Sequence, residues 1–166
     1  VGKKNVLLLH AGDFSQGTSY FTELGGDIEI DLINAMKYDV VTLGNHEFDN
    51  GIDELARRLD NLKCPVVCAN YDFSKLVLGK YVKPYTIVRK GGMKIGVIGL
   101  LTDVTRVVQR SIADKMKRFD DIEVANKWAD YLKNEEHCDM VIALTHIGFD
   151  SVGMKDPALV AGTRNI

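Results

Sequence analysis

The chain has 166 residues, of which 46% are hydrophobic and 27% are charged. A chain of this length buries about 68–70% of the surface that it exposes when unfolded, so it can form one domain with a core of its own. Its 21 basic and 23 acidic residues give a net charge of −2, which provides no electrostatic basis for binding nucleic acid or an anionic membrane.

The cysteines are three in number, so they cannot all pair with one another. An extended backbone of ~3.3 Å per residue would place Cys64 and Cys68 about 13 Å apart, too far for a disulfide. We interpret them and Cys138 as fillers of small apolar spaces, which leaves the redox compartment undecided. No apolar run is long enough to span a membrane, and no segment resembles a secretion signal. Because the chain opens with Val1 rather than Met, we expect it to be an excerpt of a longer protein.

The first half of the chain alternates predicted strands with predicted helices. Continuous apolar runs indicate strands covered on both faces, at 5–9, 40–43 and 66–69. A helix is expected from an Asp27 N-cap to Tyr38, with an apolar side made of Ile28, Ile30, Leu32, Ile33 and Met36. Another is expected over 52–62, with its arginines and acids outside and an apolar side made of Ile52, Leu55, Ala56, Leu59 and Leu62. The resulting order is β-α-β-α-β.

The second half begins with a predicted hairpin. Its strands are expected at 81–88 and 94–100, with Gly91-Gly92 as the turn. Residues 101–119 show no clear period, and we interpret them as a loop with a helical turn. Three further elements are predicted: a helix over 122–136 capped by Asp121, a buried strand over 140–144, and a short helix from Asp156-Pro157 through Ala161.

Polar residues follow the second predicted strand directly, as the motif Gly-Asn-His-Glu-Phe-Asp at 44–49. Gly44 allows a sharp turn, so that Asn45 and His46 can point into the same space. The Asn45 amide oxygen suits a hard or borderline metal ion, and His46 can hold or pass a proton near neutral pH. Asp49 can reach back to the His46 ring and fix its tautomer. The alternative is an ordinary capped loop, because Asn and Asp are common turn residues.

Two more polar residues come at the ends of predicted strands. Asp13 follows the first strand, and His146 follows the strand at 140–144. Ligands of open α/β sheets bind outside the carboxyl ends of the strands, so we expect both side chains to meet Asn45 there. A carboxylate, an amide oxygen and an imidazole suit Zn, Mn or Fe better than Ca. Alone, His146 would be interpreted as a core histidine, but the set together predicts a metal site.

Three motifs together resemble one known family. They are Gly-Asp-Phe-Ser-Gln-Gly-Thr at 12–18, Gly-Asn-His-Glu-Phe-Asp at 44–49 and Thr-His-Ile-Gly at 145–148. With these motifs in this order and spacing, the chain resembles the bacterial 5'-nucleotidase and UDP-sugar hydrolase family over almost its whole length. The members of this family are calcineurin-like dinuclear metallophosphoesterases. The resemblance implies an α/β fold, namely a four-layer α/β/β/α sandwich of two packed sheets with helices outside.

The resemblance also implies roles for individual residues. Asp13 would bridge two divalent metal ions, Zn, Mn or Fe, and Asn45 and His146 would bind the second ion. His46 would face the substrate phosphate and stabilise or protonate the leaving oxygen, with Asp49 as its partner. Glu47 would support the loop structurally.

Two motifs of this family are missing from the sequence, an Asp-x-His before the first Gly-Asp loop and a Gly-His-x-His after the strand that would follow Ile166. We therefore expect residues 1–166 to be a partial catalytic domain, incomplete at both ends and inactive alone, with its remaining metal ligands outside this chain. His10 lies at the same strand end as Asp13, but we do not expect it to replace them. A downstream substrate-binding domain is expected in the full-length protein.

The activity implied by the resemblance is hydrolysis of a phosphate monoester, most simply a nucleoside 5'-monophosphate, by a metal-activated water. The alternative is a related enzyme that cleaves a phosphodiester, a pyrophosphate or a thiosulfate ester, with 2',3'-cyclic nucleotides and UDP-sugars among the substrates. The expected partner is a small nucleotide and not a nucleic acid. Family members of this type are commonly exported, which implies the periplasm or the cell surface.

Two interpretations from other classes were weighed against this one. A non-catalytic binding module of the same fold would be expected to lose the His46 and Asp49 pair, which is intact here. A flavodoxin-like nucleotide-binding domain would share the early β-α-β-α order. It would also need a glycine-rich phosphate loop, and its sheet would not contain the hairpin at 81–100.

Overall fold

The structure is a computed structural model that describes residues 2–17, 19–150 and 155–166. Parallel strands form one sheet in the order β1-β2-β3-β5, with the bounds Leu9–His10, Val40–Thr42, Val66–Val67 and Val82–Lys83. A second sheet has the order β6-β7-β9, with the bounds Tyr85–Lys90, Met93–Leu101 and Met140–His146. There β6 and β7 form an antiparallel hairpin, and β9 runs parallel to β7. A separate antiparallel pair consists of β4 (Tyr71–Asp72) and β8 (Lys117–Arg118).

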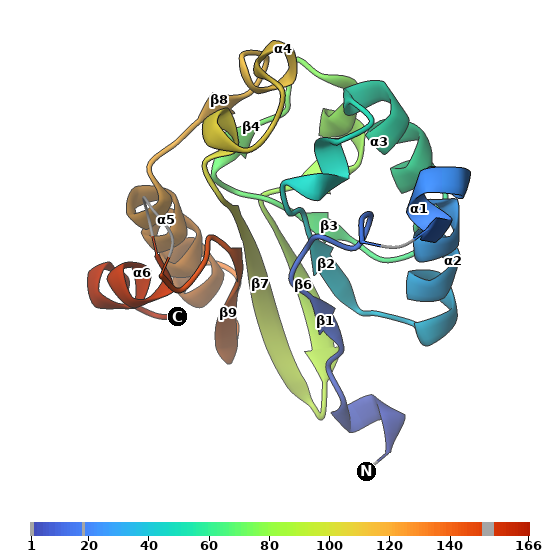
Figure 1. Ribbon diagram of the computed structural model, residues 1–166. Helices are drawn as coiled ribbons and strands as arrows, with labels where there is room; N and C mark the ends of the chain where they lie inside the picture. The colour runs from blue at the N-terminus through green and yellow to red at the C-terminus, as the bar shows by residue number, and fades with distance from the viewer. Residues whose placement is uncertain (1, 18, 151–154) are drawn as a thin grey trace.

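The helices fall into two groups that lie beside different sheets (Figure 1). The group near β1, β2 and β3 consists of α1 (Ser19–Leu24), α2 (Asp27–Met36) and α3 (Ile52–Asp60). The group near β7 and β9 consists of α5 (Asp121–Asn134) and α6 (Asp156–Gly162). The connections contain α4 (Arg110–Ala113) and short 3-10 helices at Lys3–Asn5, His46–Phe48, Val77–Lys80 and Val104–Arg106.

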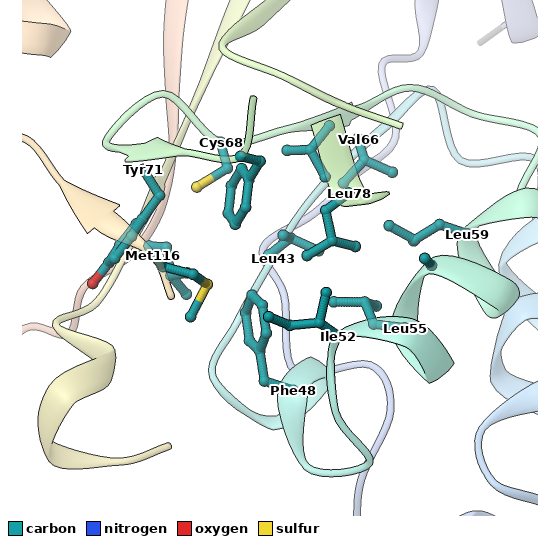
Figure 2. Packing of buried hydrophobic residues seen from close by; sticks show 14 of the residues in the cluster. Leu43, Phe48, Ile52, Leu55, Leu59, Val66, Cys68, Tyr71, Leu78 and Met116 are labelled. Atoms are coloured by element: carbon teal, nitrogen blue, oxygen red, sulfur yellow. The ribbon is translucent and has the colours of Figure 1, made fainter. Parts of the chain in front are cut away.

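Buried apolar side chains hold these elements together. Val40 of β2 packs in a cluster with Val97 of β7, whereas its neighbour Val41 packs with Leu55 of α3. The two faces of β2 are therefore both covered, which is why its sequence is apolar without alternation. Figure 2 shows the helix-side cluster, including Leu43, Ile52, Leu55, Leu59 and Leu78. Each fully buried side chain of this size contributes about 1.5–3 kcal/mol relative to an exposed one.

The predicted strand at 5–9 is much shorter in the structure. β1 begins at Leu9 because its partner β2 begins at Val40, and these two residues are paired. Upstream, Lys3–Asn5 form a 3-10 helix and Val6 is 43% exposed. The strands predicted at 40–43 and 66–69 are confirmed in their first residues, Val40–Thr42 and Val66–Val67.

The helix predicted from Asp27 is confirmed, with two corrections. Its N-cap is Gly26, which has a φ of 96°, and Asp27 is the first helical residue. Leu32 and Met36 were assigned to the apolar side, but they are 55% and 57% exposed because only one stripe of α2 faces the core. The residues of that stripe are Ile30 and Ile33.

The helix predicted at 52–62 is confirmed as α3, which ends at Asp60. Its predicted apolar side is buried, except that Leu62 lies beyond the helix. Arg58 was predicted to lie outside, and this is wrong: it is 1% exposed, because its guanidinium donates to the Glu47 carbonyl oxygen. No helix was predicted at 19–24, where the structure has α1.

The predicted hairpin is confirmed, but its first strand is divided in two. Pro84 separates β5 from β6, and it has no N–H with which to continue a ladder. Consequently Val82–Lys83 pair with β3, whereas Tyr85–Lys90 pair with β7 in the other sheet. The turn residues Gly91 and Gly92 have φ angles of 57° and 82°, which a two-residue hairpin turn requires.

The remaining elements agree with the sequence in most respects. The loop at 101–119 contains α4, a 3-10 helix and β8. The long helix is confirmed as α5, but its N-cap is Asp120, whose side chain accepts the Glu123 N–H. Asp121 is instead buried and accepts hydrogen bonds from Asn70 and Arg118. β9 extends to His146, two residues further than predicted, and α6 has its proline in the first turn.

The cysteines Cys64, Cys68 and Cys138 are free, as predicted. Burial raises the pKa of the Cys68 thiol to about 12, so this residue is an inert part of the core. Among the helices of the described ranges, none combines the length and the apolar character that crossing a membrane requires.

Candidate functional site

Three strand ends lie close together in the structure. β1 leads to Asp13, β2 leads to the loop at 44–49, and β9 ends at His146. His146 Nε2 lies 3.2 Å from Asp13 Oδ2, and the His46 N–H donates to Asp13 Oδ1 at 3.0 Å. Asp13 thus contacts both of the other chain segments that carry predicted site residues.

Two glycines allow the first two segments to approach this closely. Gly12 has a φ of 87°, and a Cβ built on it would overlap the backbone of Gly44. A Cβ built on Gly44 would in turn overlap Asp13. Asp13 itself has a φ of 54°, a left-handed conformation that costs an L-residue about 1–2 kcal/mol. The position of the Asp13 carboxylate therefore depends on a strained backbone packed against the other loop.

When the His146 ring is neutral, its contact with Asp13 places two hydrogen-bond acceptors against each other. His146 Nδ1 lies 2.7 Å from the Ala11 carbonyl oxygen, which only accepts, so the ring proton is on Nδ1. In the neutral ring, Nε2 then directs a lone pair at the Asp13 carboxylate. A proton on Nε2, or a cation shared by the two side chains, removes this conflict. A carboxylate and an imidazole nitrogen are ligands that Zn, Mn and Fe accept, so the pair fits a divalent ion.

The pKa values of this pair reflect the same contact. The hydrogen bond with Asp13 raises the pKa of His146, although burial acts in the opposite direction. Burial would raise the pKa of Asp13, but the hydrogen bonds from the His146 ring and the His46 N–H together lower it below its ordinary value. Asp13 is therefore ionised at neutral pH.

His46 and Asp49 form the predicted pair within the loop at 44–49. His46 Nδ1 lies 2.9 Å from Asp49 Oδ2, across the 3-10 helix His46–Phe48 and its C-cap. With a proton on Nδ1 shared with the carboxylate, Nε2 is the nitrogen that can accept or release another proton. The His46 side chain is 38% exposed, so a molecule in solvent can reach it.

Asn45 lies beside this pair as the N-cap of the same 3-10 helix. Its backbone carbonyl accepts the Phe48 N–H at 3.2 Å, and the residue is half-buried. Within the ranges that the structure describes, no three His, Cys, Asp or Glu side chains are grouped as metal ligands. Of the three predicted metal ligands, Asp13 and His146 are therefore in direct contact, and Asn45 lies in the adjacent loop at 44–49.

Glu47 is fully buried below the two loops. Its Oε2 accepts the N–H groups of Gly44 and Asp13, at 2.6 and 2.8 Å. Its Oε1 accepts those of Phe14 and Ser15, at 2.8 and 3.1 Å. Burial raises the pKa of Glu47, and the hydrogen bonds from Gly44 and Asp13 act against this change. Sequence reasoning gave Glu47 a supporting role but offered no sign of these partners, because nothing in the motif shows which backbone groups lie near it.

His10 lies in β1, on the strand that leads to Asp13. Its ring centroid is 5.6 Å from that of Phe14 and 5.3 Å from that of Tyr38, both in edge contacts. Burial lowers the pKa of His10, and His146 lowers it further. A neutral ring packed against two aromatic rings is a structural residue.

Comparison with known proteins identifies the class of protein. Residues 1–162 match the family described as calcineurin-like phosphoesterase. The chain therefore belongs to the calcineurin-like phosphoesterase family, and membership of this metallophosphoesterase family implies metal binding.

More particular relatives are 5'-nucleotidases and enzymes similar to them. NAD 5'-nucleotidase of Haemophilus influenzae is 41% identical over 147 residues, which are 87% of this chain and 24% of that protein. Apyrase of Tabanus yao is 35% identical over 149 residues, 89% of this chain and 26% of that protein. The crystal structure of the 5'-nucleotidase precursor from Thermus thermophilus superposes with a TM-score of 0.78 at 35% identity, covering 89% of this chain and 29% of that one.

These matches define the chain as a metallophosphoesterase domain of the 5'-nucleotidase family, with the α/β fold of that domain. The chain spans about a quarter of the length of the curated relatives that it matches.

Proposed function

We propose that the chain is part of the catalytic domain of a metal-dependent phosphomonoesterase that hydrolyses nucleoside 5'-monophosphates. The observation that carries this proposal is the geometry around Asp13: its carboxylate contacts His146 Nε2 and accepts the N–H of His46, whose ring is paired with Asp49. The family match and the 5'-nucleotidase relatives support it.

In this proposal Asp13, Asn45 and His146 would hold the divalent ions that the family implies. Such ions supply water activation near neutral pH and neutralise the oxygens of a phosphoryl group. The chain itself fixes the ligands: the Ala11 carbonyl orients the His146 ring so that Nε2 faces Asp13, and the His46 N–H holds the other Asp13 oxygen.

His46 and Asp49 are proposed to act on the leaving group. His46 Nε2, protonated, stabilises or protonates the departing nucleoside oxygen, and Asp49 keeps the ring in the orientation that exposes Nε2. A positioned general acid of this kind is worth roughly 10²–10⁴-fold in rate.

The whole protein is proposed to extend beyond residues 1–166 on both sides. An Asp-x-His segment before them and a Gly-His-x-His segment after them would complete the metal ligands and the four-layer α/β/β/α sandwich. A downstream substrate-binding domain, nucleotide catabolism as the role, and a periplasmic or cell-surface location belong to the same proposal. The short span of this chain relative to its relatives supports the presence of further domains.

A second candidate is cleavage of a pyrophosphate or phosphodiester bond in a larger nucleotide. Two relatives support this second candidate by their names, an NAD 5'-nucleotidase and an apyrase. The residues described above bind a phosphoryl group in either case, and the nucleoside would be selected elsewhere in the protein.

The test uses the purified full-length protein with Mn²⁺ and compares AMP, NAD, UDP-glucose and a 2',3'-cyclic nucleotide. We expect phosphate release from AMP with the highest kcat/KM, abolished by a chelator and restored by Mn²⁺. A preference for NAD or UDP-glucose would select the second candidate. No hydrolysis of any of the four with added Mn²⁺ would contradict both.

A further inference from the structure

We propose that Glu47, supported by Arg58, is a positioning residue that sets the spacing of the metal-ligand loops before any metal binds. The proposal rests on the proposed function, because it assigns Glu47 to the site that Asp13, Asn45 and His146 form. It goes further in naming, as the group on which ligand geometry depends, a buried carboxylate that is neither a proposed metal ligand nor a proposed acid.

The four hydrogen bonds of Glu47 are divided between its oxygens in an informative way. Oε1 binds two consecutive N–H groups of the Asp13 segment, those of Phe14 and Ser15. Oε2 binds one N–H from each segment, those of Asp13 and Gly44. Because Glu47 itself belongs to the loop at 44–49, its bonds to the N–H groups of Asp13, Phe14 and Ser15 all join that loop to the Asp13 segment, at 2.8, 2.8 and 3.1 Å.

This arrangement requires a carboxylate and excludes an amide. Each oxygen accepts two N–H donors, so a glutamine at this position would direct its NH2 group at two donors in either orientation. Buried donors without an acceptor move apart or recruit water, and here such movement would separate the Asp13 segment from Gly44. The Glu47→Gln substitution is thus nearly isosteric and yet disrupts the contact between the loops.

Arg58 fixes the backbone of Glu47 from the helix side. Its Nη2 donates to the Glu47 carbonyl oxygen at 3.1 Å, and the side chain is 1% exposed on α3. Burial lowers the pKa of Arg58, and the charge of Glu47 is one of those that act against this change. α3 is in turn anchored in the core by Leu55 and Leu59, so the position of Glu47 is tied to the rigid part of the domain.

The consequence is a preformed position for Asp13. Its backbone is left-handed and therefore strained, and its N–H is one of the groups that Glu47 binds. The bond to Glu47 holds the Asp13 backbone, and the His46 N–H holds Asp13 Oδ1, so that Oδ2 is directed at His146. Loss of a residue that orients a metal ligand in this way costs about 10–100-fold in metal affinity or activity.

The test is made in the full-length protein, freed of metal and titrated with Mn²⁺ by calorimetry, with the Mn²⁺ signal in electron paramagnetic resonance recorded in parallel. Glu47→Gln is expected to stay folded and to bind Mn²⁺ at least tenfold more weakly, with an altered resonance signal. The matched control is Glu54→Gln, since Glu54 is an acid on α3 that binds Arg57 at the surface. This control is expected to bind Mn²⁺ like the wild type.

A purely structural role for Glu47 would lower the melting temperature but leave the Mn²⁺ dissociation constant of the folded fraction unchanged, and that result would overturn the proposal. If Glu47→Gln does not fold, Glu47→Asp decides, because it keeps the charge but is too short to reach both loops. At least tenfold weaker Mn²⁺ binding by Glu47→Asp would support the proposal, and wild-type binding would overturn it. A wild-type protein that binds no Mn²⁺ would instead contradict the proposed function.

Discussion

Strands β6, β7 and β9 contain six, nine and seven residues, whereas β1, β2 and β3 contain only two, three and two. The sheet with long strands is held by a continuous ladder and by packing against α5. The sheet with short strands passes quickly into loops, and a buried Glu47 carboxylate joins these loops. Regular structure thus supports the molecule on one side, while irregular backbone on the other side carries most of the predicted site residues. Substitutions on the two sides should therefore have different consequences.

The largest effect is expected from Asp13→Ala on the side with short strands. It removes the carboxylate shared by His146 and the His46 N–H, so calorimetry of the full-length protein should show loss of metal binding. Turnover should fall by more than about 100-fold, since losing even a residue that only orients a ligand costs about 10–100-fold. Unchanged metal content would remove Asp13 from the proposed ligands.

The next effect is expected from His46→Ala. Its kcat for AMP should fall by roughly 10²–10⁴-fold, because a general acid is lost while the metal ligands stay in place. Metal analysis of the same preparation should match the wild type. An undiminished kcat would exclude His46 as the acid, whereas loss of metal would make it a ligand.

A core substitution in the long-stranded sheet sharpens the contrast. Ile98→Ala in β7 should lower the free energy of unfolding by about 2–5 kcal/mol, because the Ile98 side chain is fully buried and its loss leaves a cavity. Its Mn²⁺ affinity should be unchanged in the folded protein.

Val41→Ala in β2, at equal burial, should weaken Mn²⁺ binding as well, because β2 leads directly into the loop at 44–49. The Mn²⁺ affinity of each variant is corrected for its folded fraction, which is measured by urea unfolding. Equal corrected affinities for the two variants would refute the contrast between the sheets.

The smallest effect is expected at the junction of the two sheets. Pro84→Ala should destabilise the protein by only about 0.4–1 kcal/mol, through greater freedom of the unfolded chain. Kinetics with AMP should not change, since β5 is at the opposite edge of its sheet from β1, and β6 is at the opposite edge of the other sheet from β9. A large change in kcat would contradict this prediction and would mean that the conformation at Pro84 affects the position of the site residues.

The difference between the two regions also explains what the sequence could predict. The hairpin with its Gly91-Gly92 turn and helix α5 were predicted because periodicity and turn chemistry extend over many residues. The limits of β1 were not, because they depend on where β2 begins. The split at Pro84 could have been anticipated, since proline lacks the N–H of a ladder.

Within the candidate site, the sequence identified the residue types and the structure supplied their partners. Their positions after strands predicted that Asp13, Asn45 and His146 meet, and the structure brings Asp13 and His146 into direct contact. The bonds of Glu47 and the burial of Arg58 could not be predicted, because both depend on backbone groups from distant segments. An arginine with charged neighbours on a helix has the same pattern whether it faces solvent or a carbonyl oxygen.

The most direct test is a crystal structure of the full-length protein soaked with Zn²⁺, with anomalous diffraction recorded at the zinc edge. An anomalous peak about 2.0–2.2 Å from both an Asp13 carboxylate oxygen and His146 Nε2 is the predicted result. An ordered protein with Asp13 and His146 still in direct contact, and with zinc bound elsewhere or absent, would contradict a shared metal site at these residues.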